Sequence, residues 1–154
     1  MKHLSPERDD RASLKALLAA LDASETTLRR DLVRGEGRAG NWAICGKLGH
    51  VYPDGDGYLL CVVADDERNR SARRWTNVKA RLADICRVTQ DGDDQGCLYL
   101  DRLPAPHEAA VIREALGIRK RRTVSDEARR HLEAARRATK SLSNGSGSLR
   151  RLTA

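Results

Sequence analysis

The chain has 154 residues, of which 40% are apolar, with four cysteines, no Phe and a net charge of +7. This length fits one domain with appendages. No stretch approaches the roughly 18 apolar residues that cross a membrane, so we expect no membrane partner. The basic excess is local, because residues 118–154 carry 11 basic and 3 acidic side chains, while residues 1–38 and 39–117 are each close to neutral. A near-neutral body with a basic tail is typical of a protein that binds a polyanion.

The first residues, "MKHLSPERDD", contain no apolar run, so we expect no signal peptide. Four separate cysteines in such a chain are expected to stay reduced, which predicts a cytoplasmic protein. The preference for Arg and Ala over Lys points to a bacterial gene.

Residues 1–38 predict a two-helix element. Ser5-Pro6-Glu7 has the residue types that begin a helix. An apolar stripe follows at helical spacing, formed by Leu14, Leu17, Leu18 and Leu21. Ser24 can cap a second helix that ends at Gly35. Two helices joined by a short turn form either a helix-turn-helix or a plain helical hairpin.

Residues 39–117 predict a small α+β domain. Strands are expected at 42–46, 50–52, 58–64, 85–90 and 97–101, and helices at 71–83 and 103–117. "PDGDG" and "DGDDQG" are typical of hairpin turns. We expect Trp75, Val78 and Leu82 to form the buried face of the first of these helices. The order of elements predicts an antiparallel sheet with two helices.

Residues 118–154 predict a basic, partly helical and partly disordered tail. Ser125 can cap a helix whose apolar stripe is thin, so we expect the helix to become ordered on a partner. The basic residues of this tail that we expect to contact phosphate are Arg119, Lys120, Arg121, Arg122, Arg129, Arg130, Arg136 and Arg137. In a helix, arginines seven residues apart form a cationic stripe, which neutralises phosphates with little sequence preference. The predicted fold class is therefore α+β: an N-terminal helical hairpin, a small antiparallel sheet with two helices, and this tail.

The stretch "ALLAALDASETTLRRDL", residues 16–32, resembles the helix-turn-helix of DeoR-type transcriptional repressors. The resemblance implies DNA binding and transcription regulation. It places Thr26, Thr27, Arg29 and Arg30 on the side of the second helix that enters the major groove. A helix-turn-helix protein is expected to be a homodimer. The alternative is a hairpin whose arginines are simply solvated.

The cysteines and aspartates favour structural roles over a metal or catalytic centre. Cys45 and His50 are five residues apart and lack the paired spacing of zinc ligands. "DGDG" lacks the late Glu of a calcium loop. A metal-dependent nuclease would need the carboxylates of Asp54 or Asp93 beside a Lys or His. We expect no catalytic residue, no metal and no cofactor.

These patterns predict a non-catalytic nucleic-acid-binding protein, with DNA preferred to RNA, acting as a small bacterial regulator or accessory factor. A protein-interaction module with a basic docking tail is the alternative, and a metal-dependent nuclease comes third.

Overall fold

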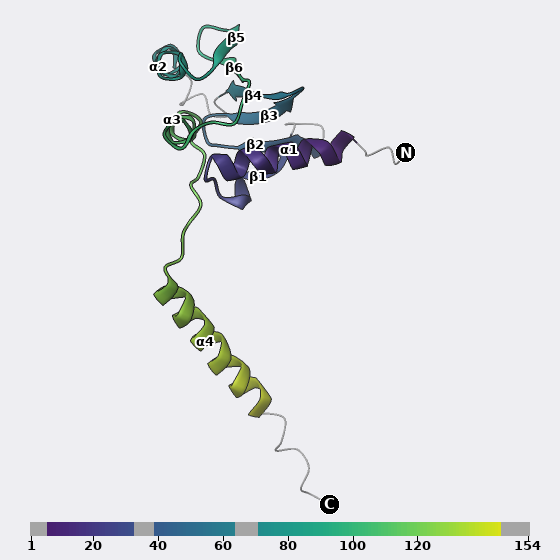
Figure 1. Cartoon of the computed structure of the whole chain (residues 1–154), viewed down its shortest axis with the longest axis vertical. Helices are drawn as coiled ribbons and strands as arrows, with labels where there is room; N and C mark the ends of the chain where they lie inside the picture. Colours follow the sequence, from purple (N-terminus) through teal and green to yellow (C-terminus); the bar gives the residue numbers. More distant parts are fainter. Residues whose placement is uncertain (1–5, 33–38, 64–70, 146–154) are drawn as a thin grey trace, which may run out of the picture. The chain divides into compact units, whose positions relative to one another are not determined.

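The computed structural model describes residues 6–32, 39–63 and 71–145, except for the side chains of residues 6–9, 32, 39 and 141–145. Contacts between residues divide the chain into two units, Met1–Arg121 and Arg122–Ala154. In Figure 1, the first unit contains a sheet and helices α1, α2 and α3, and the second contains helix α4.

Helix α1 (Pro6–Ala20) confirms the predicted apolar stripe. Leu14, Leu17 and Leu18 are at most 8% exposed and belong to the core, as does Leu21 directly after the helix. The chain leaves the helix at Asp22, whose φ of 48° lies in the left-handed region. The proposed capping residue Ser5 lies outside the described residues.

The second helix predicted to begin at Ser24 was wrong. Glu25–Thr27 form one short 3₁₀ turn, η1, and Leu28–Leu32 form strand β1; the predicted end at Gly35 lies outside the described residues. Leu28 lies opposite Ile44 of the next strand and packs against the core, while Arg29 is exposed. Pairing with that strand and the burial of Leu28 therefore decide the conformation here. Residues 24–32 therefore contain a 3₁₀ turn and a strand instead of a second helix, and the predicted N-terminal helical hairpin was wrong.

The first unit is built on one six-stranded antiparallel sheet of order β1-β2-β3-β4-β6-β5. The strands after β1 are β2 (Ala39–Cys45), β3 (His50–Asp54), β4 (Gly57–Val62), β5 (Arg87–Asp91) and β6 (Gly96–Leu100). All five lie close to the predicted positions, and Gly55, with a φ of +58°, sits in the predicted turn between β3 and β4. The predicted fold class is nevertheless corrected, because the N-terminal segment adds one helix and one strand to a sheet-dominated unit.

Helices α1, α2 (Ala72–Leu82) and α3 (Pro106–Leu116) pack on the same face of the sheet. Their apolar side chains form one core with alternate residues of the strands, including Ile44, Val51, Leu60, Leu98 and Leu100. Successive side chains of a strand point to opposite faces. The strand residues that alternate with these core residues therefore point away from the helices. We call that side the opposite face, and it includes Cys45, His50, Cys61 and Cys97.

Trp75 joins α2 to the β5–β6 hairpin. Its side chain is 1% exposed, and its Nε1 donates a hydrogen bond of 2.8 Å to Asp91 Oδ1. A Cβ atom at Gly96 would lie 2.3 Å from the indole carbon Cζ2, so only glycine permits this close approach. The buried face predicted for α2, with Trp75, Val78 and Leu82, is confirmed.

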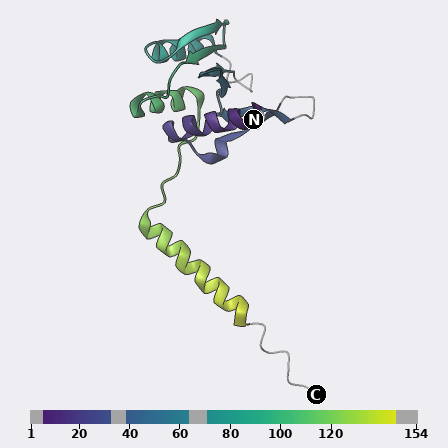
Figure 2. The same cartoon turned by 45° about the vertical axis from the view of Figure 1, so that its right-hand side comes forward.

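The second unit contains helix α4 (Asp126–Gly145), which runs without interruption in Figure 2. The predicted cap is present, because the Ala128 amide donates to Ser125 Oγ at 3.2 Å. Asp126 and Glu127 in the first turn complement the positive end of the helix dipole.

Candidate nucleic-acid interface

The exposed arginines of α4 lie on one side of the helix. At 3.6 residues per turn, Arg129, Arg130, Arg136 and Arg137 fall within a sector of about 120° and span about 12 Å along the axis. All four side chains are exposed. We call these four residues the arginine face, and it has the spacing that the sequence predicted.

One carboxylate lies in the middle of this face. Glu133 is four residues after Arg129 and four before Arg137, the spacing at which opposite charges on a helix attract. Glu133 therefore lowers the positive potential at the centre of the arginine face.

The other side of α4 is thinly apolar. Leu132 is 53% exposed, and residues 121–140 are all exposed. An isolated helix of this length is marginal in water, because it has no buried face to add to its intrinsic propensity. Within the described residues, the helix therefore depends on its own propensity and on its N-terminal cap.

The predicted basic run before α4 is partly neutralised within the first unit. Lys120 Nζ lies 3.9 Å and Arg121 Nε lies 3.1 Å from the carboxylate of Asp22. The Ser24 amide also donates to the Arg119 carbonyl at 2.8 Å. Arg119, Lys120 and Arg121 therefore close the fold beside the end of α1, whereas Arg122 begins the second unit.

The four residues expected to face a DNA groove do not form one common surface. Thr27 is 6% exposed and its hydroxyl donates to the Ser24 carbonyl at 2.6 Å, while the Thr26 hydroxyl contacts that of Ser24. Arg29 and Arg30 are successive residues of β1, so they point to opposite faces of the sheet.

The guanidinium of Arg30 is engaged within the fold. It lies 5.4 Å from the centre of the Trp42 ring, which Arg11 also contacts at 4.7 Å. Without a recognition helix in this segment, the reason for expecting a homodimer disappears.

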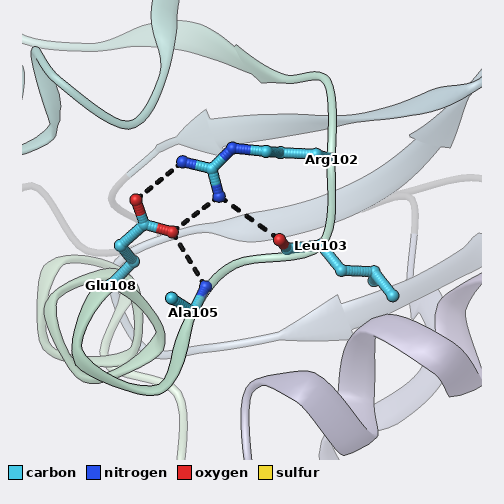
Figure 3. A network of polar contacts seen from close by, with 4 residues as sticks. All are labelled: Arg102, Leu103, Ala105 and Glu108. Carbon is cyan, nitrogen blue, oxygen red and sulfur yellow. Dashed lines mark hydrogen bonds and ion pairs between the residues drawn. The ribbon is translucent and has the colours of Figure 1, made fainter.

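A carboxylate that we did not single out from the sequence is held by three donors, as Figure 3 shows. Both guanidinium nitrogens of Arg102 donate to the carboxylate of Glu108 at 2.7 Å, and the Ala105 amide donates to it at 2.8 Å. Arg102 first, and this amide second, lower the pKa of Glu108 to about 2. The Glu at the third position of a helix that begins with Pro106 is the signal that predicts such a cap. The group fixes the start of α3, and the low pKa of Glu108 keeps its carboxylate ionised and makes it a weak base near neutral pH.

Arginines of α2 line a groove of about 330 Å³ against α3. Arg73 and Arg81 contribute to its wall, together with Glu114 from α3. Arg81 donates to the Glu114 carboxylate at 2.6 Å, which compensates one of the positive charges. The groove is therefore less basic than the sequence of α2 indicates.

The candidate metal ligands form a row across the opposite face. Strand register places Cys45 opposite His50, His50 opposite Cys61, and Cys61 opposite Cys97. Across the described residues, no three His, Cys, Asp or Glu side chains are arranged to hold a metal ion. His50 Nδ1 is buried and, within that same part of the chain, has no hydrogen-bond partner.

The aspartates of the β3–β4 turn, Asp54 and Asp56, are exposed, as is Asp93 in the β5–β6 turn. Separately, none of the helices in the described part of the chain is long and apolar enough to cross a membrane.

The contact that the sequence did not reveal is between two of these cysteines. Cys97 Sγ lies 2.9 Å from Cys61 Sγ, although the two residues are 36 positions apart. No local pattern predicts this contact, because it depends on β6 pairing with β4 and not only with its neighbour β5.

Comparison of the chain with protein-family models, curated proteins and solved structures finds no match. Among the described residues, the arginine face of α4 is the strongest indication of a partner.

Proposed function

We propose that this protein binds nucleic acid without catalysis, through the arginine face of α4. The observation that carries the proposal is the placement of four exposed arginines within one sector of about 120° on a capped helix. Each arginine that contacts a phosphate displaces condensed counterions, which gives affinity at low salt with little dependence on base sequence.

Charge distribution supports this assignment to the second unit. Residues 122–154 carry 8 basic and 3 acidic side chains, whereas residues 1–121 carry 21 basic and 19 acidic. Attraction to a polyanion is therefore concentrated in the second unit, in which residues 122–140 are all exposed. We propose that α4 gains stability when it binds, as arginine-rich segments do when they fold on a nucleic acid.

Duplex DNA is the preferred partner in this proposal. An α-helix with its side chains is about 10–12 Å wide, and the major groove of B-DNA is about 12 Å wide. The major groove of A-form RNA is too deep and narrow for side chains to read. We propose a small regulator or accessory factor of a bacterial cytoplasm, whose four free cysteines suit a reducing compartment.

Binding of the full chain to labelled duplex DNA and duplex RNA, measured across a salt series, tests the proposal. The matched variant replaces Arg129, Arg130, Arg136 and Arg137 by Ala, which preserves helix propensity. We expect DNA binding that weakens steeply with salt and is lost in the variant.

Polyglutamate serves as the competitor that separates the two classes of partner. If the full chain binds polyglutamate as tightly as DNA, the nucleic-acid assignment is wrong and an acidic protein surface becomes the partner to seek. If the variant retains full DNA affinity, the assignment of binding to α4 is wrong.

A further inference from the structure

Two cysteines of the opposite face lie on adjacent central strands. Cys61 of β4 and Cys97 of β6 are directly opposed in the strand register. Directly opposed residues of antiparallel strands have Cα atoms about 4.5–5.5 Å apart, which lies within the range of about 4.4–6.8 Å that a disulfide spans. Their sulfur atoms are already 2.9 Å apart. A covalent bond between them needs no rearrangement of the backbone.

We propose that Cys61 and Cys97 are a reversible thiol–disulfide site that reacts with a small-molecule disulfide of the glutathione class. One cysteine, as thiolate, attacks the oxidant and releases one small thiol, leaving a mixed disulfide on the protein. The second cysteine then attacks that mixed disulfide and releases the second small thiol. The two cysteines lose two electrons and two protons, and the oxidant takes up both as two thiols.

The other two cysteines lack this geometry and provide matched controls. Cys45 Sγ lies 3.9 Å from the Ala43 carbonyl, and its register partner on β3 is His50 and not a cysteine. Cys86 is 7% exposed and belongs to the helix-side core. A metal is not a competing explanation for this row, since the described His, Cys, Asp and Glu side chains include no set of three that could hold one.

Burial of Cys61 and Cys97 slows their reaction with a small-molecule disulfide but does not prevent it. Cys97 is 7% exposed, and Cys61 is more accessible. Burial first, and the neighbouring Cys97 thiol second, raise the pKa of Cys61 to about 12. Because only the thiolate attacks a disulfide, we expect the reaction to need hours near neutral pH. Such a pair responds to a sustained change of redox poise and not to a brief pulse of oxidant.

The disulfide would tie together segments that are distant in sequence. The loop closed by Cys61 and Cys97 includes α2 and β5, so the bond removes conformational freedom from the unfolded chain across a third of the first unit. We expect the thermal midpoint to rise on the order of 10 °C. This inference is independent of the arginine face, which lies in the other unit.

The test incubates the folded full chain with oxidised glutathione at pH 8.5, then counts free thiols after denaturation and maps the linked peptides. We expect the count to fall from four to two, with Cys61 joined to Cys97 and a higher thermal midpoint. In the Cys45→Ser/Cys86→Ser double variant, which has only Cys61 and Cys97, the count should fall from two to none with the same rise of the thermal midpoint. Cys61→Ser should give at most a glutathione adduct on Cys97.

Two results would overturn the proposal. Two free thiols after prolonged incubation of the double variant, which has only Cys61 and Cys97, would show that the pair does not react. A disulfide that forms only under denaturing conditions would show that the native register does not place the sulfurs for bonding.

Discussion

Replacing Arg136 and Arg137 by Ala should halve the salt dependence of DNA binding. The arginine face offers four cations, and each neutralised phosphate contributes about −0.9 to the slope of log affinity against log salt. Four contacts predict a slope of about −3.6, which is roughly a 150-fold loss of affinity between 50 and 200 mM salt. Two contacts predict about −1.8, or roughly a 12-fold loss over the same range. Fluorescence anisotropy with a labelled duplex measures both slopes.

Two further variants control for net charge and for position. Arg73→Ala/Arg87→Ala removes the same charge from exposed sites in the first unit and should leave the slope near −3.6 by the same estimate of about −0.9 per contact. Glu133→Gln removes the carboxylate at the centre of the arginine face and should raise affinity at low salt. If the control pair lowers the slope as much as the Arg136/Arg137 pair, the protein binds through its total charge, and our localisation to α4 is refuted.

Gly96→Ala should destabilise the first unit by about 1–3 kcal/mol, because its Cβ would overlap the Trp75 indole; an unchanged midpoint in urea would contradict this packing. The pKa of Glu108, lowered to about 2 from its usual 4.5 by Arg102, means that its contribution is complete above pH 4.5 and is lost as pH falls toward 2. Glu108→Gln should therefore flatten urea stability across that range, and a curve as steep as that of the parent would count against the cap. Burial first, and the Glu108 charge second, raise the pKa of Cys86 to about 12. It should resist iodoacetamide at pH 8.5 until the protein is unfolded, and rapid native labelling would show that the core opens there.

Elements with local signals were predictable from the sequence. Helix α3 begins with Pro106 and ends at Gly117, whose φ of 63° is the left-handed conformation expected of a C-terminal cap. The β3–β4 hairpin follows from Asp-Gly pairs, and the arginine spacing of α4 follows from residues seven apart. In each case the residues that determine the element lie close together in the sequence, so a short stretch of sequence contains them.

The N-terminal strand was not predictable in this way. Leu28 and Leu32 are four residues apart, a spacing that fits one face of a helix and also one face of a strand. What separates the two is the partner, since Leu28 lies opposite Ile44 in β2. Ser24 suits a helix cap equally well, but its amide is instead bonded to the Arg119 carbonyl. The sequence pattern was compatible with both answers, and long-range pairing decided between them.

The arginine face and the cysteine pair differ in the same way in how far the sequence predicts them. The arginine face is a property of one helix and was expected from the sequence, whereas the neutralisation of Lys120 and Arg121 by Asp22 joins residues about a hundred positions apart. The Cys61–Cys97 contact needs β6 to lie between β4 and β5, an order that reverses the sequence order of β5 and β6. The spacing of charges along one helix can be recognised in a short stretch of sequence. Contacts between strands whose order in the sheet differs from their order in the sequence cannot be recognised in this way.

The two proposals lie in different units, and this separation makes them independently testable. Oxidation of Cys61 and Cys97 should raise the thermal midpoint of the first unit without altering the salt slope of DNA binding. Loss of arginines from α4 should reduce that slope without altering the number of thiols that oxidise. If oxidation did change the slope, the first unit would have to contribute phosphate contacts of its own, and the basic residues of α2 and β1 would then be the ones to replace next.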